Sequence, residues 1–271
     1  MEPNDDQDLA RLFPNIAAQL RGALGNIHYA AAALAPAEAR ERDPELDGRA
    51  ALLDQSYYQL LRLINNLTEA AWLSSDRPLA VKNCDLVELM GELCGRAESL
   101  AALLGLKLTF SCAMASHVCA VNRDSFEQLF FQLLSNAFKF TPAGGTVTVE
   151  LRAAGDRLRL SVSDTGCGIP EELLPTLFDR YLHAELMNPA PHGLGLGLPL
   201  CRRIAEGHGG SIMAESRVGQ GTTVVFSFPD RRSEKDEVSD LPFDYAGGFN
   251  TTLLELADAL PSKAFLLREQ E

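Results

Sequence analysis

Apolar residues in the first quarter of the chain recur every three or four positions, the spacing of one face of an α-helix. The first stripe consists of Leu9, Leu12, Ile16, Leu20, Ala23, Leu24, Ile27, Ala31 and Leu34. The break "PAEARERDPELDG", rich in proline and charge, ends it. The second stripe consists of Leu53, Tyr57, Leu60, Ile64, Leu67 and Ala71. Two long helices around a short break predict an antiparallel hairpin.

A helical hairpin alone buries too little apolar surface to be stable. Pairing it with a second copy gives a four-helix bundle, so the pattern predicts a homodimer through residues 9–74.

After residue 80 the pattern alternates between helix and strand. Helical segments are "DLVELMGELCGRAESLAALLG", "SFEQLFFQLLSNAFKFT" and one that begins at "GLPLCRRIAEG". Strand segments are "LKLTFSC", "HVCAV", "GTVTVELRA", "DRLRLSVSD", "SIMAES" and "TTVVFSF". Gly155 and Asp156 join two of them in a hairpin. The pattern predicts an α+β sandwich, with helices on one face of a mixed, largely antiparallel sheet.

The chain therefore divides into three predicted parts. Residues 1–79 form the helical hairpin, residues 80–229 form the α/β sandwich, and residues 230–271 form an acidic tail. The tail segment "TLLELADALPSKAFLLREQE" is amphipathic enough for a short docking helix, which packs on the body or binds a partner.

Charge and composition narrow the classes of molecule that the protein is expected to bind. The formal charge of -13 disfavours nucleic acid and anionic membranes. No apolar stretch approaches the ~20 residues of a membrane helix, and "MEPNDDQDLA" lacks the basic start of a signal peptide. The six cysteines show no paired spacing, which favours reduced thiols over disulfides or zinc. We expect a cytoplasmic protein.

Five short segments between residues 131 and 223 carry residue types suited to a nucleotide site. They are "QLLSNAFKF" with Asn136 and Lys139, "DTGCGIP" with Asp164, Gly166 and Gly168, "LFDRY" with Phe178 and Arg180, "GLGLGL" with Gly193, Gly195 and Gly197, and "GQGTT" with Gly219, Gly221 and Thr222. Each alone is a weak signal. Together, in this order and on the predicted elements, they resemble the ATP-binding domain shared by sensor histidine kinases, DNA gyrase, Hsp90-type chaperones and mismatch-repair ATPases.

The resemblance implies a role for each segment toward Mg²⁺ and ATP. Asn136 would bind Mg²⁺ through its amide oxygen, a hard ligand, and Lys139 would add a positive charge near the phosphates. Asp164 would accept a hydrogen bond from the adenine amino group. Gly166 and Gly168 would let the backbone turn tightly under the base.

The remaining motif residues are expected around the phosphates. Phe178 would help to close the pocket, and Arg180 could face phosphate. The glycines at 193, 195 and 197 would form a loop before a helix whose exposed N–H groups cradle phosphate. His192 precedes this loop, where it either touches phosphate or sits in the lid.

One residue bears on the branch of the family. The ATPase branch and the related serine kinases carry a glutamate base four residues before the metal-binding asparagine, where this chain has Gln132. An amide cannot accept a proton at neutral pH, so hydrolysis and serine phosphorylation are disfavoured. The histidine kinase branch typically has asparagine there, from which Gln132 also departs. The hairpin favours that branch, because "LLDQSYYQLLRLINNLTEAAWL" resembles the second helix of its dimerisation domain.

The histidine that this branch phosphorylates is missing. Its box reads Ser-His-Glu-Leu-Arg-Thr-Pro-Leu, and "QLRGAL" aligns with the last six residues. The histidine then falls on Ala18, the acidic residue on Gln19 and the threonine on Gly22. Position 18 lies opposite the apolar stripe, so we expect it to be exposed.

These substitutions remove the chemistry of autophosphorylation. A methyl group cannot attack the γ-phosphate, Gln19 cannot take a proton from an imidazole, and Gly22 lacks the hydroxyl implicated in phosphatase activity. His28 lies ~15 Å further along the helix and faces another direction, so we expect a solvated histidine there. The spacing of the other histidines suggests no metal site.

The leading hypothesis is a dimeric, histidine-kinase-like protein that binds Mg-ATP or ADP without ordinary autophosphorylation. Such a pseudokinase would act as a regulator or scaffold in two-component signalling, with a response regulator or a partner kinase as its partner. One alternative is an active kinase that phosphorylates a histidine on another protein in trans. The other is an interaction module with a vestigial nucleotide pocket.

Overall fold

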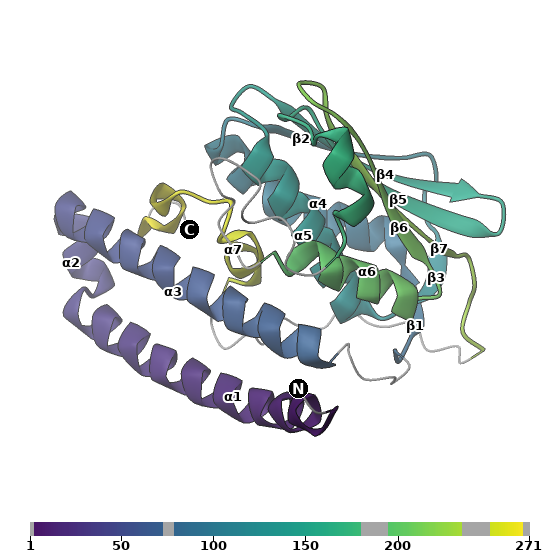
Figure 1. Cartoon of the computed structure of the whole chain (residues 1–271). Coiled ribbons are helices and arrows are strands. Elements are labelled where there is room, and N and C mark those ends of the chain that lie inside the picture. Colours follow the sequence, from purple (N-terminus) through teal and green to yellow (C-terminus); the bar gives the residue numbers. More distant parts are fainter. Residues whose placement is uncertain (1–2, 73–78, 180–194, 235–249, 268–271) are drawn as a thin grey trace. The chain divides into compact units, whose positions relative to one another are not determined.

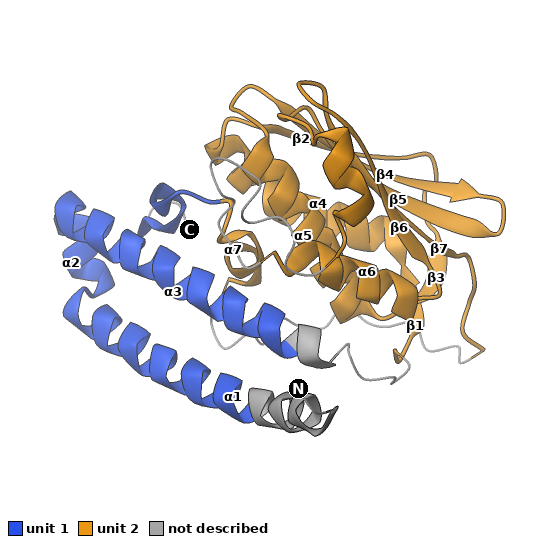
Figure 2. Ribbon diagram, viewed as in Figure 1, with its two compact units in different colours: residues 1–76, 260–271 blue, residues 77–259 orange. Residues whose placement is uncertain are grey.

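The computed structural model describes residues 3–72, 79–179, 195–234 and 250–267 (Figure 1). The chain divides into two compact units (Figure 2). The helical unit comprises residues 1–76 and 260–271, and the α/β unit comprises residues 77–259. The C-terminal segment is therefore shared between the units. Among the described residues, no helix combines the length and apolar character needed to cross a membrane.

The helical unit contains the predicted hairpin. Its elements are α1 (Pro3–Leu34), α2 (Ala37–Arg42), α3 (Pro44–Trp72) and the short 3₁₀ helix η2 (Ser262–Phe265). Arg21 of α1 donates a hydrogen bond to the side-chain oxygen of Asn65 on α3 at 3.1 Å, and His28 stacks on Tyr57. The later residue of α1 pairs with the earlier residue of α3, so the two helices are antiparallel.

The predicted break between the long helices is itself partly helical. It contains α2, and α3 begins directly after it at Pro44, the first-turn position that proline tolerates best. The Asp43 carboxylate accepts hydrogen bonds from the backbone N–H groups of Glu45 and Leu46, which satisfies donors that the helix leaves unpaired. The break thus restarts the helix rather than ending the pattern.

The expectation that His28 is solvated is wrong. Its side chain is only 28% exposed, its ring centroid lies 4.2 Å from that of Tyr57, and its Nδ1 lies 3.6 Å from an Asp54 carboxylate oxygen. Position along a single helix did not identify which residues face the second helix.

Much of the predicted apolar stripe is exposed in this structure. Ile16, Leu20 and Ile27 of α1 are 48–59% exposed, and Leu60 of α3 is 47% exposed. By contrast, Ala17, Tyr57 and Ile64 are buried. Tyr57 and Ile64 belong to the predicted stripe of α3, so part of that stripe faces the inside of the hairpin, whereas the exposed members of the two stripes form an apolar surface.

The α/β unit contains every helix and strand predicted for it. Its helices are α4 (Leu86–Leu103), α5 (Arg123–Phe140), η1 (Glu171–Thr176), α6 (Gly197–Gly207) and α7 (Thr251–Leu256). Its strands are β1 (Lys82–Asp85), β2 (Lys107–Cys112), β3 (Val118–Val121), β4 (Thr146–Ala154), β5 (Arg157–Asp164), β6 (Ser211–Arg217) and β7 (Gly221–Pro229). Strand β1, with the polar sequence "KNCD", was not predicted, because it has no apolar alternation.

The main sheet has the order β2-β4-β5-β7-β6, in which β2 and β4 are parallel and the other pairs antiparallel. Strands β1 and β3 form a small antiparallel pair. Figure 1 shows α4, α5 and α6 together on one side of the main sheet. Alternate residues of β4 and β5 are buried against these helices, among them Val147, Val149, Leu151, Leu158, Leu160 and Val162. The predicted α+β sandwich is confirmed.

The tail differs from the single docking helix that was expected. It forms two short helices, α7 in the α/β unit and η2 in the helical unit. Asn250 caps α7 by accepting a hydrogen bond from the Leu253 N–H, and Pro261 directly precedes η2. Helix α7 ends at Leu256, and Pro261, which cannot donate a helical hydrogen bond, disfavours one continuous helix through the segment.

Candidate functional site

The site is built around Asp164, the last residue of β5. One oxygen of its carboxylate accepts a hydrogen bond from the Gly166 N–H at 2.8 Å and another from the Thr222 N–H at 3.3 Å. Thr222 lies 58 residues further along the chain, on β7. Because β5 and β7 are neighbours in the sheet, their ends bring the "DTGCGIP" and "GQGTT" segments together.

The two glycine-rich turns press so closely on each other that side chains do not fit between them. A Cβ atom on Gly168 would lie 2.1 Å from the Arg217 carbonyl oxygen, and one on Gly221 would lie 1.9 Å from the Asp164 carbonyl oxygen. Both glycines also have positive φ angles, which side-chain-bearing residues rarely adopt. These glycines are therefore required by backbone contact and not only by turn conformation.

The C-terminal end of α5 joins the same place. The Phe140 carbonyl oxygen accepts a hydrogen bond from the Cys167 N–H at 3.2 Å. A Cβ atom on Gly166 would lie 2.4 Å from this oxygen. Asn136 and Lys139 are both half-buried on the last turns of α5, the helix whose C-terminal end this hydrogen bond holds at the Asp164 turn.

The start of α6 packs on α5 one turn before Asn136. A Cβ atom on Gly197 would lie 2.8 Å from the side-chain oxygen of Gln132, which is buried. Gly195, two residues earlier, has a φ of +66°. The helix start that the glycine-rich loop was expected to lead into thus adjoins the predicted metal-binding side of α5.

The structure brings most of the predicted site residues into this one region. Asp164, Gly166, Gly168, Gly219, Gly221 and Thr222 form its base, Asn136 and Lys139 flank it on α5, and Gly195 and Gly197 adjoin it at α6. Phe178 is half-buried after η1, and its part in the pocket stays a prediction. Arg180, His192 and Gly193 lie outside the described residues.

Ser216 of β6 belongs to the site and was missed. Its hydroxyl accepts a hydrogen bond from the Ile169 N–H at 2.7 Å, and it lies 2.9 Å from the Gly221 carbonyl oxygen and 2.8 Å from the Thr222 hydroxyl. It therefore ties the two glycine turns together. A lone serine in a strand carries no motif, so only the pairing of β6 with β7 identifies it.

Burial sets the electrostatics of the site. It raises the pKa of Asp164 above the ordinary range of an aspartate, although the hydrogen bonds from Gly166 and Thr222 act in the opposite direction. The carboxylate thus carries a desolvation cost. A ligand that donates a hydrogen bond to it would offset that cost.

On the helical unit, the position aligned with the phosphoacceptor is exposed, as expected. Ala18, Gln19 and Gly22 are all exposed on α1. Solvent access at position 18 is therefore present, while the imidazole that would use it is absent.

We expect Gly221→Ala to destabilise the α/β unit far more than Gly219→Ala. Both glycines have positive φ, which costs an alanine about 1 kcal/mol. A Cβ atom at 219 meets nothing within 4 Å, whereas one at 221 meets the Asp164 carbonyl oxygen at 1.9 Å. Urea unfolding should show at least about 2 kcal/mol more loss for Gly221→Ala. Equal losses would contradict the close contact of the two turns.

Asp164→Asn tests the raised pKa. A group whose pKa is higher in the folded chain adds stability below its unfolded pKa and loses that contribution as the pH rises through the folded pKa. Asparagine keeps the acceptor oxygen without the charge. The variant should therefore melt about 2–4 °C higher than the wild type near pH 7, with a smaller difference near pH 4. A difference independent of pH would refute the desolvation cost.

Comparisons with known proteins agree with this geometry. Residues 121–232 match the family described as histidine kinase-, DNA gyrase B-, and HSP90-like ATPase. The circadian input-output histidine kinase CikA of Synechococcus elongatus is 34% identical over 176 residues, which are 64% of this chain and 23% of CikA. Across the first relatives found, the chain spans between 23% and 39% of their length.

Solved structures agree in fold. Full-length ShkA in complex with AMPPNP aligns over 82% of this chain and 46% of its own, with a TM-score of 0.68 and 23% identity. The histidine kinase ThkA in complex with the response regulator TrrA aligns over 84% of this chain and 65% of its own, with a TM-score of 0.55 and 23% identity. Residues 121–232 therefore belong to the histidine kinase-, DNA gyrase B-, and HSP90-like ATPase family, and the chain, with its helical hairpin, is similar to sensor histidine kinases.

Proposed function

We propose that this protein binds Mg-ATP and acts as a regulator or scaffold of two-component signalling without phosphorylating itself at the usual position. The observation that carries the proposal is the combination of a preformed base around Asp164 with an exposed alanine at position 18. The base around Asp164 is suited to holding a nucleotide. A hairpin with alanine at position 18 has no nucleophile there to receive the γ-phosphate.

The proposed adenine end of the site is the half-buried carboxylate of Asp164. Two backbone N–H groups hold one of its oxygens, and partial burial raises its pKa. The amino group of adenine is a hydrogen-bond donor of the kind that offsets this cost. Gly166 leaves the space beside the carboxylate free of a side chain.

The phosphate end is supported by the donor set on α5. The amide oxygen of Asn136 is a hard, neutral ligand that fits Mg²⁺, which when bound would bridge and neutralise the phosphates. Lys139, one turn further on, would add a positive charge, and the N–H groups at the start of α6 would face phosphate oxygens. Gln132 lacks the basicity needed to activate water, which favours binding over hydrolysis.

Autophosphorylation is unsupported on the described part of the hairpin. Ala18 has no nucleophile and Gln19 has no carboxylate to accept a proton. His28 is packed against Tyr57 and lies beside Asp54, which restricts its access to a γ-phosphate. Binding without transfer leaves conformational change as the output, through the different contacts that bound and free states make.

A response regulator is the proposed partner class, because ThkA, which shares the fold, was solved in complex with one. A second copy of the chain is the proposed partner for the exposed apolar stripe. Ile16, Leu20 and Ile27 on α1 and Leu60 on α3 would become buried in a four-helix bundle.

Nucleotide binding without phosphorylation is tested with radiolabelled Mg-ATP. We expect Mg-ATP at 100 times its Kd to stabilise the chain by ~2.7 kcal/mol in thermal unfolding. Asn136→Ala should abolish this shift, while Asn26→Ala on the exposed side of α1 should keep it. No acid-labile, alkali-stable label should appear on the chain.

Two other outcomes identify the alternatives. Label on a histidine of an added partner would establish a kinase acting in trans, and no thermal shift would establish a vestigial pocket. Label on the chain itself would contradict the loss of autophosphorylation.

The dimer is tested by Leu60→Asp. A charge in the buried centre of a bundle would be strongly unfavourable, so multi-angle light scattering should give half the mass of the wild type. The hairpin itself should stay folded, because Leu60 is 47% exposed in the protomer. Ala18→Asp, on the same unit but away from the stripe, should remain dimeric. Equal masses for all three proteins would refute this interface.

A further inference from the structure

The last described segment, residues 250–267, does not belong to a single unit. Residues up to Ala259 lie in the α/β unit, and Leu260 and the residues after it lie in the helical unit. We call this segment the C-terminal strap. Each half makes its own set of specific contacts within its unit.

The first half of the strap is anchored on the helix that carries Asn136. Helix α7 packs on α5, and Leu253 and Leu256 of α7 are fully or almost fully buried. Arg96 of α4 donates hydrogen bonds to the hydroxyls of Thr251 and Thr252, the latter at 2.9 Å.

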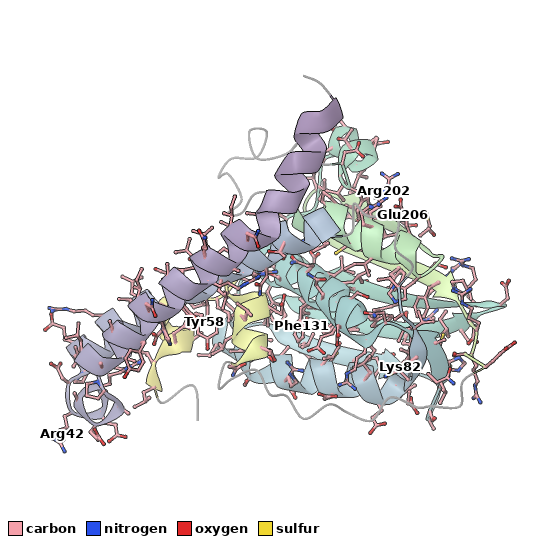
Figure 3. All side chains as sticks on the ribbon, turned by 90° about the horizontal axis from the view of Figure 1, so that it is seen from below. Arg42, Tyr58, Lys82, Phe131, Arg202 and Glu206 are labelled. Carbon is pink, nitrogen blue, oxygen red and sulfur yellow. The ribbon has the colours of Figure 1, made fainter. Side chains whose placement is uncertain are left out.

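Arg96 is itself held by α5. It donates a hydrogen bond to the Glu127 carboxylate at 2.9 Å, and its guanidinium lies 5.6 Å from the centroid of the Phe131 ring. Figure 3 shows Phe131 beside the yellow ribbon of α7. One side chain therefore joins α4, α5 and α7, and the strap is attached to the candidate nucleotide helix by both packing and charge.

The second half of the strap is held by a different kind of surface on the hairpin. The Phe265 side chain is fully buried, and its ring centroid lies 5.4 Å from that of Tyr58 on α3. Arg40 donates a hydrogen bond to the Phe265 carbonyl oxygen at 3.0 Å, and Gln55 donates one to the Leu260 carbonyl oxygen at 2.7 Å. These contacts are directed at the peptide backbone, with one aromatic side chain as the anchor.

Ion pairs within the helical hairpin hold the side chains of this surface in place. The Arg40 guanidinium is fixed by the Asp47 carboxylate at 2.8 Å and the Asp54 carboxylate at 3.0 Å. The Asp47 carboxylate also accepts a hydrogen bond from the Leu267 N–H at 3.4 Å. Donors and acceptors for a passing backbone, set around an aromatic contact, are the features by which proteins bind short peptides.

We propose that Arg40, Asp47, Gln55 and Tyr58 form a peptide-docking surface whose occupant is this chain's own residues 260–267. With its first half on α5, the docked strap couples the helix of Asn136 to α3 of the hairpin. The docking is independent of the proposed function. Only the coupling rests on it, because it requires a nucleotide at the α5 site.

Docking is tested with a fluorescent peptide of residues 258–267 added to the full-length chain. Phe265→Ala removes the anchor from the chain and vacates the surface, so this variant should bind the peptide at least ten times more tightly than the wild type. Lys263→Ala, which changes an exposed residue of the same segment, should bind like the wild type. Equal binding by all three chains would overturn the proposal.

Hydrogen exchange provides a second readout on the same chains. Amides of residues 260–267 should exchange at least ten times faster in Phe265→Ala, while amides of β4 and β5 keep their wild-type rates. Gln55→Ala leaves the sequence of the strap intact but removes a donor to the Leu260 carbonyl oxygen, so amide exchange in the strap should become faster. Ser56→Ala is the control, because the Ser56 hydroxyl donates to the Leu52 carbonyl oxygen of its own helix, and exchange in the strap should keep its wild-type rate. If the amides of residues 260–267 keep their wild-type exchange rates in both Phe265→Ala and Gln55→Ala, the docking proposal is overturned.

Coupling is tested by adding Mg-ADP and following both thermal stability and exchange. Bound nucleotide should change exchange in residues 260–267 of the wild type and leave it unchanged in Phe265→Ala. A thermal shift without any exchange change in the wild-type strap would refute coupling while nucleotide binding stands. Absence of a thermal shift would refute the proposed function, and the peptide experiment would still decide the docking.

Discussion

The Asp164 carboxylate, accepting two backbone hydrogen bonds where two glycine turns meet, is the interaction on which the rest of the site depends. Gly166 and Thr222 can both reach it only because β5 and β7 are paired and because Gly168 and Gly221 have no side chains. The Cys167 N–H then fixes the end of α5 through the Phe140 carbonyl oxygen. The positions of three segments far apart in the sequence therefore depend on one half-buried carboxylate and the backbone groups around it.

The position of the Asp164 carboxylate is energetically unfavourable and suits it to binding a ligand. Partial burial of the Asp164 carboxylate is unfavourable and raises its pKa, and groups with shifted pKa values cluster at functional sites. The helical hairpin, in contrast, exposes a position that carries no reactive group. Position 18 has the exposure that phosphotransfer requires and none of the chemistry. This combination of a half-buried carboxylate at the candidate nucleotide site and an alanine at position 18 is the reason for our proposal that nucleotide binding changes conformation instead of leading to phosphotransfer.

The parts of this architecture that are local in sequence were predictable. The period of apolar residues predicted the long helices and the strands, and the glycine and aspartate motifs indicated the segments that the fold brings together around Asp164. Interactions that depend on which helices and strands lie next to each other could not be predicted from the sequence. Ser216 has no motif, β1 has no apolar alternation, and His28 could be placed against Tyr57 only once the second helix was known. The division of the tail at Leu260 depends on the hairpin surface that receives Phe265, which no pattern within the tail encodes.

The most direct measurement of the central claim is an NMR titration of the isotopically labelled chain with Mg-ADP. The account predicts that the backbone N–H signals of Gly166 and Thr222, the two donors to Asp164, shift together along one saturation curve, and that Asp164→Asn abolishes both shifts. Saturable nucleotide binding that leaves these two signals unmoved would place the nucleotide elsewhere and contradict the account.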